Sequence, residues 1–235
     1  MYDRMTTTVQ ILCSLIAANH QMLVSILLGG LLYYIGWRMT KAKLHDEELF
    51  KQPPPPEDCP ICMLPLPSLY TGRKYRACCG KIICSGCIHA VENRDGGVGL
   101  CPFCRTPAPT AKELVEQNKN RMKVDDANAM YNLGCCYSEG SHALPQDHTK
   151  ALELWHRAAE LGNAKSYYSI GADYYEGNGV ERDEKKAKHY WELSAMGGHL
   201  DARHNIGVNE GNAGNMDRAL KHHMIAAEFG DDDSL

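Results

Sequence analysis

Hydrophobic and polar residues follow three different patterns along the 235-residue chain. Residues 5–37 contain no aspartate, glutamate, lysine or arginine, and residues 22–37 are continuously apolar or small. Residues 58–109 carry only short apolar runs, which cysteine, proline and glycine interrupt. From about residue 125 to 230 the apolar positions recur at helical spacing, with alanines and regularly placed glycines among them. These patterns predict an N-terminal hydrophobic helix, a small irregular module and an all-helical region.

The N-terminal segment, residues 1–40, is predicted to contain a single membrane-spanning helix over residues 15–37. A span needs about 20 mostly apolar residues, and this stretch supplies them if the polar residues 19–21 are tolerated. Alternatives are a hydrophobic helix docked on another protein and a cleaved signal peptide, although a signal peptide has a shorter apolar core and a more basic start. The end of this stretch carries the aromatic residues Tyr33, Tyr34 and Trp37, and the basic residues Arg38, Lys41 and Lys43 follow it. This order predicts that the C-terminal side of the helix faces the cytosol.

Three further segments are predicted from local signals. Residues 41–57 read as a charged and proline-rich linker, because the four prolines at 53–56 cannot continue a helix and favour an extended chain. Residues 110–124 are expected to form a connecting helix, opened by a capping box of Thr110 and Glu113. Residues 231–235 form an acidic tail that is expected to be solvated.

Residues 125–230 contain an internal repeat. The segments D-A-N-A-M-Y-N-L-G, N-A-K-S-Y-Y-S-I-G and D-A-R-H-N-I-G align, and their last residues, Gly134, Gly171 and Gly207, lie 37 and 36 positions apart. A second block with a helical pattern follows each segment. Because one helix pair cannot bury its own apolar face, such pairs stack, and the period predicts an α-solenoid of about three helix pairs.

The residue types within each unit have predicted structural roles. Leu133, Ile170 and Ile206 are expected in the buried stripe, and small residues should let neighbouring helices approach closely. Glycine suits left-handed turn positions, and aspartate suits helix N-caps. We therefore expect turns at Gly140, Gly177 and Gly179 and N-caps at Asp147 and Asp183.

The signature A-x3-L-G-x2-Y-x2-G, then G-V-x2-D-x2-K-A and A-A-x2-G, runs through this region, with G-V-E-R-D-E-K-K-A at 179–187. With it, residues 125–230 resemble the Sel-one-like repeats, relatives of the tetratricopeptide repeat. The resemblance implies an adaptor surface that recruits a protein client, without catalysis. The tyrosine and histidines of the region are expected to pack or face solvent without binding metal: Tyr174, His199, His204, His222 and His223.

Charge and cysteine content limit the function classes. The formal net charge is −4, which argues against a general nucleic-acid binder, because such binding neutralises phosphates with lysine and arginine. Eight of the eleven cysteines lie between Cys59 and Cys104, and three C-x2-C pairs occur among them. Repeated C-x2-C pairs are typical of structural zinc sites with four thiolates. The sequence thus predicts two structural Zn²⁺ ions, which a segment of about 50 residues needs because its core is small.

The stretches C-P-I-C at 59–62, C-C-G-K-I-I-C-S-G-C at 78–87 and C-P-F-C-R at 101–105 resemble a RING finger of the all-cysteine type. The resemblance implies a small α+β module over residues 58–109 with two cross-braced zinc ions. It implies that the first zinc takes Cys59, Cys62, Cys84 and Cys87. The second would take Cys78, Cys79, Cys101 and Cys104.

The middle of the motif departs from the common RING pattern. Most RING fingers have a histidine here, whereas this chain has Lys81, whose ammonium cannot ligate zinc. The adjacent Cys78 and Cys79 are also unusual, because the family normally has a residue between these two ligands. His89 is the alternative fourth ligand if the adjacent cysteines cannot both reach one ion.

Two other zinc modules fit less well. C-G-K-I-I-C-S-G-C is also similar to the middle of a FYVE finger, which binds phosphoinositide, but that family needs a cysteine where this chain has Arg76. A nucleic-acid zinc ribbon needs more basic residues than Arg73, Lys74, Arg76 and Lys81 supply. Both remain minority interpretations.

The RING resemblance implies a ubiquitin ligase or ligase subunit that binds a ubiquitin-charged conjugating enzyme and acts by orienting it, without a covalent intermediate. By the resemblance, Ile61, Val91 and Pro102 would contact the conjugating enzyme, and Arg105 would contact both it and ubiquitin. The alternative is that the first two pack the small core and that Arg105 is a solvated charge. A non-catalytic scaffold is therefore the second hypothesis. In both cases the RING and the repeats are expected to face the cytosol from a membrane anchor, or otherwise to be cytoplasmic.

Overall fold

The computed structural model describes residues 28–67, 72–94 and 99–229, and the chain divides into two units, Met1–Glu48 and Leu49–Leu235. In the first unit, residues 28–48 are helical and their apolar side chains are exposed, Leu32 and Tyr33 among them. No helix within the described ranges combines the length and apolar character that a membrane crossing requires. Residues 15–27 and the acidic tail at 231–235 lie outside the described residues, so the span over 15–37 stays a prediction.

The segment predicted to be a linker differs from that expectation in its first part. Residues 41–49 are helical, because K-A-K-L-H-D-E-E-L consists largely of good helix formers and contains neither proline nor glycine. The helix ends at Leu49, and residues 52–57, which include the prolines at 53–56, have no regular secondary structure. Leu49 is fully buried within the second unit.

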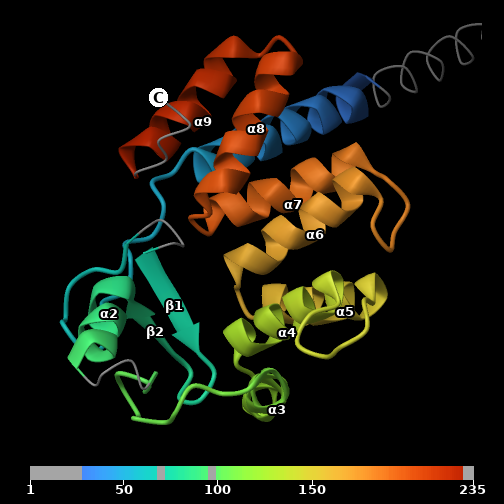
Figure 1. Ribbon diagram of the computed structural model, residues 1–235. Coiled ribbons are helices and arrows are strands. Elements are labelled where there is room, and N and C mark those ends of the chain that lie inside the picture. The colour runs from blue at the N-terminus through green and yellow to red at the C-terminus, as the bar shows by residue number, and fades with distance from the viewer. Residues whose placement is uncertain (1–27, 68–71, 95–98, 230–235) are drawn as a thin grey trace, which may run out of the picture. The chain divides into compact units, whose positions relative to one another are not determined.

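The cysteine-rich segment folds around a two-stranded antiparallel sheet and one helix (Figure 1). Strand β1 (Arg73–Arg76) pairs with β2 (Lys81–Cys84) in a register that places Arg73 opposite Cys84, and α2 (Ser85–Arg94) follows directly. The buried core consists of five residues: Cys59, Leu66, Ile83, Ile88 and Cys101. A core this small, two of whose members are cysteines, supports the expectation that the segment needs metal to stay folded.

Helix α3 (Ala111–Met122) connects this segment to the repeats. The predicted capping box is present: the Glu113 backbone N–H donates to the Thr110 hydroxyl, and the Thr110 backbone N–H donates to the Glu113 carboxylate at 2.8 Å. The two bonds fix the point where the chain turns from irregular into helical structure.

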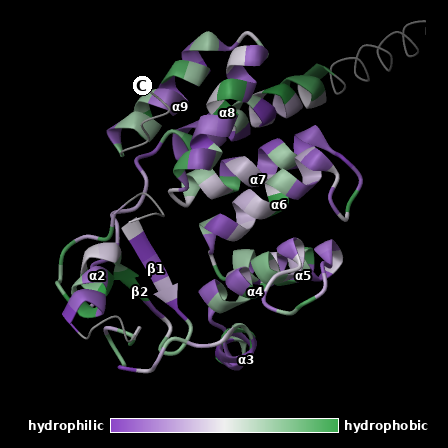
Figure 2. Ribbon diagram, in the orientation of Figure 1, coloured by the Kyte–Doolittle hydropathy of each residue, from purple (hydrophilic) through white to green (hydrophobic). Residues whose placement is uncertain are grey.

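Three helix pairs follow, and consecutive helices pack against each other (Figure 1). Each helix has 13 residues, and Figure 2 shows that hydrophobic and hydrophilic residues are mixed along the helices, as expected where one face is buried. Leu133, Ile170 and Ile206 are buried, which confirms the predicted stripe. The pairs are α4 (Ala127–Glu139) with α5 (His148–Glu160), α6 (Ala164–Glu176) with α7 (Glu184–Met196), and α8 (Leu200–Asn212) with α9 (Met216–Glu228).

The predicted helix boundaries are confirmed at the caps. The carboxylates of Asp147 and Asp183 accept hydrogen bonds from the first turns of α5 and α7. Gly140 and Gly177 end α4 and α6 with φ of 64° and 82°, values that an L side chain rarely adopts. Asp126 and Asn163, which were not predicted as caps, cap α4 and α6 in the same way.

The glycines that mark the repeat make room for a ring from the second helix of the same pair. A Cβ atom at any of these positions would collide with that ring, so glycine allows the two helices to approach closely. The third pair differs because its ring belongs to histidine where the first two have tryptophan. The glycine and ring pairs are Gly134 with Trp155, Gly171 with Trp191, and Gly207 with His223.

Two histidines of the repeats are buried. His199 is 3% exposed and caps α8, its Nδ1 accepting from the Ala202 N–H. His222 is fully buried on α9. Among the described residues, no histidine belongs to a group whose geometry could hold a metal ion.

Candidate metal centres

The first group of cysteines is assembled by a loop, a strand end and a helix start. Cys59 and Cys62 lie in a tight turn, closed by hydrogen bonds from the Cys59 N–H to the Leu64 carbonyl (2.8 Å) and from the Met63 N–H to the Cys59 carbonyl (2.9 Å). Cys84 ends β2, and Cys87 lies in the first turn of α2. The four sulfur atoms lie within 4.8 Å of one another.

The second group has the same turn and a different partner loop. Cys101 and Cys104 lie in a turn where the Cys101 N–H donates to the Thr106 carbonyl (2.8 Å) and the Arg105 N–H donates to the Cys101 carbonyl (2.9 Å). Cys78 and Cys79 lie in the loop between β1 and β2. Their sulfurs and those of Cys101 and Cys104 also lie within 4.8 Å of one another.

Both C-x2-C turns use a left-handed residue that is not glycine. Met63 has φ 58° and Arg105 has φ 62°, and each stands directly after the second cysteine of its pair. The matching bonds and dihedrals show that the two turns have the same backbone geometry. Nothing in the residue types at 63 and 105 indicated this conformation, which glycine or asparagine normally adopts.

The sulfur positions suit a tetrahedral ion. Four thiolates bound to zinc at about 2.3 Å lie about 3.8 Å apart at the corners of a tetrahedron. The distance between Sγ atoms is 3.9 Å for Cys59 and Cys87 and 3.8 Å for Cys62 and Cys84. In the second group it is 3.9 Å for Cys79 and Cys101 and 3.4 Å for Cys78 and Cys104. Both groups are therefore compatible with zinc in size and in ligand type.

The acidity of the thiols also indicates that each group needs a counter-charge. Burial, reinforced by Cys104 and Cys101, raises the pKa of Cys78, and burial with the neighbouring thiols raises the pKa of Cys87 to about 12. Burial also acts to raise the pKa of Cys59, but hydrogen bonds from backbone N–H groups outweigh it and lower that pKa to about 6. Four thiols at this spacing cannot all ionise alone, whereas a bound dication deprotonates its ligands.

The structure groups the cysteines in the two sets that the RING resemblance implied, alternating pair by pair along the chain. The adjacent Cys78 and Cys79 both belong to the second set. His89, the alternative ligand, is exposed on α2 and belongs to neither set in the described part of the chain. Lys81 lies over the ring of Phe103, 5.9 Å from its centroid.

The predicted contact residues are accessible to differing degrees. Ile61 is 39% exposed and lies between the cysteines of the first turn. Val91 and Pro102 are partly buried, and Arg105 is exposed. Exposed apolar side chains also surround the turns at positions that were not predicted, namely Met63, Leu64 and Phe103. The turns therefore present apolar surface to solvent, which is typical of an interaction site.

Contacts that sequence reasoning missed connect the second cysteine group to the helical region. Arg121, at the end of α3, donates through Nη2 to the Cys79 carbonyl (2.9 Å) and through Nε to the Asp126 carboxylate (3.2 Å). The Tyr75 hydroxyl donates to the same carboxylate at 2.8 Å. Gly80, at φ 69°, leaves the space that the Arg121 guanidinium fills. No local motif marks such contacts, because the partners are 42 and 51 residues apart.

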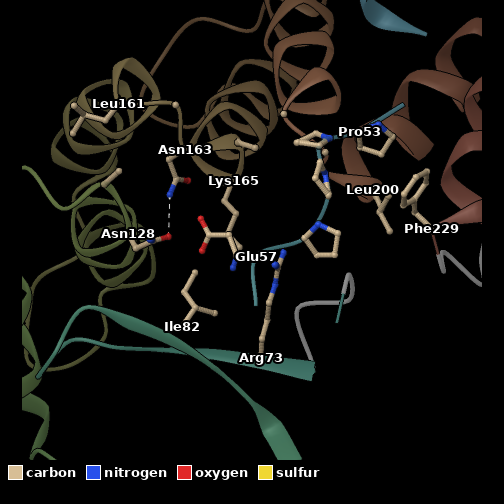
Figure 3. A pocket seen from close by; sticks show the side chains of 18 residues that line it. Pro53, Glu57, Arg73, Ile82, Asn128, Leu161, Asn163, Lys165, Leu200 and Phe229 are labelled. Atoms are coloured by element: carbon tan, nitrogen blue, oxygen red, sulfur yellow. Dashed lines mark hydrogen bonds between the residues drawn. The ribbon is translucent and has the colours of Figure 1, made fainter. Parts of the chain in front are cut away.

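A cleft of about 450 Å³ lies between the proline segment, the sheet and the turns of the repeats (Figure 3). Glu57, Arg73 and Lys165 line it, and Asn163 donates to Asn128 at 3.2 Å within it. Burial, together with the charge of Arg73, lowers the pKa of Lys165 to about 8. The cleft thus combines two cationic side chains with one carboxylate.

Comparison with known proteins identifies the repeats. Residues 127–163 and 164–199 match the family described as the Sel1 repeat. These two segments are Sel1 repeats. They correspond to α4 with α5 and α6 with α7, so the predicted resemblance is confirmed for the first two pairs. The pair α8 and α9 lies outside the matched residues and has histidine in place of the tryptophan of the others.

Curated relatives match short parts of the chain. The chain is 44% identical over 52 residues to the E3 ubiquitin-protein ligase DA2 of Arabidopsis thaliana, which is 22% of this chain and 12% of that protein. It is 41% identical over 54 residues to the ERAD-associated E3 ubiquitin-protein ligase component HRD3A of the same plant, covering 23% and 8% of the two chains. The chain thus spans about a tenth of the length of these relatives.

Among solved structures, a Sel1 repeat protein from Oxalobacter formigenes is similar over 52% of this chain and 51% of that chain. The sequence identity is 25% and the TM-score is 0.49.

Proposed function

We propose that the chain is a RING-type ubiquitin ligase, or a subunit of one, in which residues 58–109 bind two zinc ions and the helical repeats recruit a protein client. The observation that carries the proposal is the pair of alternating cysteine groups with tetrahedral sulfur spacing. The names of two relatives that match part of the chain, both connected with E3 ubiquitin ligases, support the same conclusion.

In this proposal zinc is structural, because four thiolates close its coordination shell and leave no position for a reactive water. The chain's own side chains then act by binding and orienting. Ile61, Val91 and Pro102 contact the conjugating enzyme, and Arg105 donates hydrogen bonds that hold ubiquitin against it. Holding the thioester between the conjugating enzyme and ubiquitin in one reactive geometry accelerates the transfer of ubiquitin, because rotational and translational freedom is already removed.

The repeats bring the client to the same molecule. Arg121 and Tyr75 connect the cysteine module to the first repeat, so a client bound to the helices stays near the charged enzyme. The cleft lined by Arg73 and Lys165 suits an acidic client segment, because its two cations outnumber the single carboxylate of Glu57.

Two measurements test the proposal. Metal analysis of the full chain should give two zinc ions per molecule, and one ion or none would contradict the paired sites. The full chain should also accelerate ubiquitin discharge from a panel of charged conjugating enzymes. Ile61→Ala should abolish the acceleration, whereas Val124→Ala, which truncates a 68% exposed apolar residue outside both turns, should not. Two zinc ions without any acceleration would favour the non-catalytic scaffold.

A further inference from the structure

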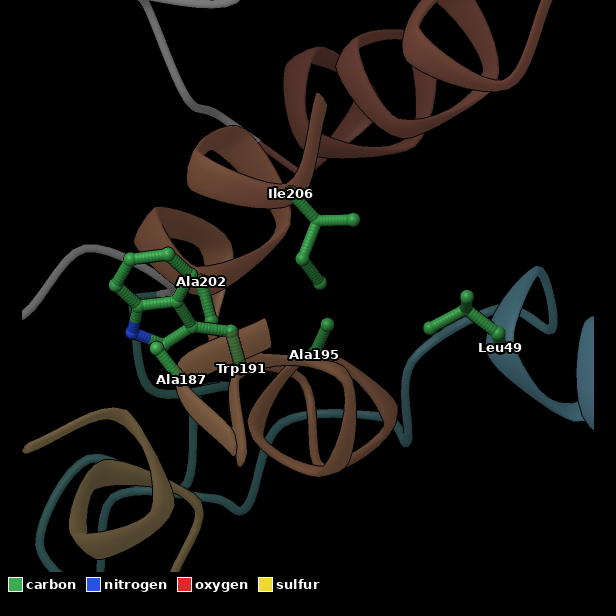
Figure 4. Close-up of a cluster of buried hydrophobic side chains, with 6 residues drawn as sticks. All are labelled: Leu49, Ala187, Trp191, Ala195, Ala202 and Ile206. Atoms are coloured by element: carbon green, nitrogen blue, oxygen red, sulfur yellow. The ribbon is translucent and has the colours of Figure 1, made fainter. Parts of the chain in front are cut away.

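The segment between the N-terminal helix and the prolines contacts α7 of the second helix pair and α8 and α9 of the third. Leu49 is fully buried and belongs to a cluster of side chains from α7 and α8, together with Trp191, Ala195 and Ile206 (Figure 4). Three members of this cluster are alanines, so Leu49 is one of its three large apolar side chains, with Trp191 and Ile206. A leucine at the end of a charged helix is thus part of a core whose other members lie 138 to 157 positions further along the chain.

The backbone of Leu49 is recognised as well as its side chain. Arg203, 1% exposed on α8, donates through Nη1 to the Leu49 carbonyl at 3.0 Å and through Nη2 to the Ala195 carbonyl at 2.9 Å. Each carbonyl lies in the last turn of a helix, where the helix dipole attracts a cation, and the Ala195 carbonyl also accepts from the Gly198 N–H at 3.0 Å. One buried guanidinium therefore binds the carbonyls of Leu49 and of Ala195 in α7.

Phe50 adds an aromatic anchor on α9. Its ring lies 4.7 Å from that of His222, and the charged groups of Arg218 and Lys221 lie over it at 5.1 and 5.3 Å. Burial, with Arg203 and Arg218, lowers the pKa of His222 to about 4, so the imidazole is neutral when it packs against Phe50. A leucine pocket, a carbonyl clamp and a cation-flanked aromatic site lie next to one another.

The groove is larger than the segment that fills it. Beyond Phe50 it continues along α9, lined by Gln52, Met224 and Ile225, with a volume of about 790 Å³. Met224 is 62% exposed although it is apolar. The Gln52 amide donates to Glu228 at 3.2 Å at the exposed rim of the groove. A peptide with a further apolar side chain after the phenylalanine would thus bury surface that this chain leaves open.

We propose that α7, α8 and α9 form a peptide-binding groove for a helix that ends in Leu-Phe and continues as extended chain, and that residues 49–52 occupy it as an internal ligand. Recognition combines a leucine pocket, the Arg203 clamp on a terminal carbonyl and a phenylalanine site with two cations. While residues 49–52 are bound, the third pair is closed to other peptides of this kind. The inference depends neither on zinc nor on ubiquitin transfer.

The test removes the internal ligand by substitution, which vacates the groove, and then adds the same segment as a separate peptide. The probe is a fluorescein-labelled peptide of residues 41–57, and the proteins are the full chain and its L49D/F50A variant. The variant should bind the peptide with an increase in fluorescence anisotropy. The unaltered chain should bind it about a hundredfold more weakly, because its own tethered segment competes at high effective concentration.

Matched controls distinguish specific binding in this groove from non-specific binding of the peptide. A peptide in which both Leu49 and Phe50 are alanine should not bind the vacated chain. The full-length Leu44→Asp variant, which alters an exposed leucine and keeps the internal ligand, should bind the labelled peptide as weakly as the unaltered chain does. Equal binding to the unaltered and vacated chains, binding of the alanine peptide, or no binding to a folded vacated chain would overturn the proposal.

The L49D/F50A chain could also lose structure in its third pair, and the proposal still makes a definite prediction. In that case the peptide should restore the lost helical circular dichroism and slow amide exchange in α8 and α9, while the alanine peptide should not. Failure of the peptide to restore either signal would overturn the proposal.

Discussion

Arg121 is expected to raise the zinc affinity of the second cysteine group (Cys78, Cys79, Cys101 and Cys104), although it is not one of the ligands. Its guanidinium donates to the carbonyl of Cys79, a member of that centre, and to the Asp126 carboxylate. Arg121→Met keeps the length of the side chain and removes both donors. Asp126 keeps three other donors, the Tyr75 hydroxyl and two N–H groups at the start of α4, so it stays satisfied. The effect of the substitution therefore falls mainly on the Cys79 carbonyl.

The size of the effect follows from that single bond. A hydrogen bond from a charged donor contributes about 1.5–3 kcal/mol. The Arg121 side chain is 32% exposed, so water replaces part of the lost interaction and the lower figure, about 1.5 kcal/mol, applies. That free energy corresponds to about a tenfold loss of zinc affinity, which agrees with the cost of removing outer contacts from metal ligands in general. The first centre should not change, because Cys79 is not among its ligands.

A competition titration with a chromophoric zinc chelator measures this prediction. The unaltered chain should release two zinc ions at similar chelator concentrations, whereas Arg121→Met should release one of them at about a tenfold lower concentration. Arg94→Met, which removes an exposed arginine at the end of α2, is the control and should leave both steps in place. If Arg121→Met shifted both steps equally, or neither, the bond to Cys79 would not have the proposed role.

Three further results are expected. Gly171→Ala should lower the free energy of unfolding in urea by about 1–2 kcal/mol, because its methyl group overpacks a buried ring, whereas Gly211→Ala, whose nearest neighbour would be 3.8 Å away, should not destabilise the chain. Arg73→Gln should raise the pKa of Lys165 above about 8 in an NMR titration, and an unchanged pKa would exclude their coupling. Burial lowers the pKa of His199 in the folded chain from 6.5 to about 3. The neutral imidazole therefore contributes fully to the stability of the folded chain above pH 6.5, and this contribution is lost as the pH falls from 6.5 towards 3. His199→Asn, which keeps an N-cap, should remove this part of the acid destabilisation.

Local signals in the sequence predicted the helical region well. Gly134, Gly171 and Gly207 fixed the period, and aspartate caps and left-handed glycines marked where helices begin and end. These features act over a few residues, so one sequence contains them in full. The ring that each repeat glycine faces was not predicted, because it comes from the other helix of the pair.

Long-range contacts explain what the sequence did not predict. Residues 41–57 looked like a linker because they are charged and end in prolines, yet Leu49 and Phe50 are anchored by Arg203 and His222. Two apolar residues are too short a pattern to indicate burial, and a buried arginine has no signature of its own. The metal sets were implied by resemblance to RING fingers, whereas spacing alone left the choice between Cys78 and His89 open. Geometry places Cys78 with the other three sulfurs.

The proposed contact with the conjugating enzyme should require zinc in both cysteine groups, because the contacting residues lie in the turns of both groups. Ile61 lies in the turn of the first centre, and Pro102 and Arg105 lie in the equivalent turn of the second. Cys78→Ser removes one ligand of the second centre without touching any of these side chains. It should therefore leave about one zinc per chain and an intact first turn, yet abolish ubiquitin discharge. Cys135→Ser, in α4 outside both groups, is the matched control and should keep two zinc ions and full discharge. Full discharge by Cys78→Ser at one zinc per chain would show that the first turn alone suffices and that the second does not contribute to the contact.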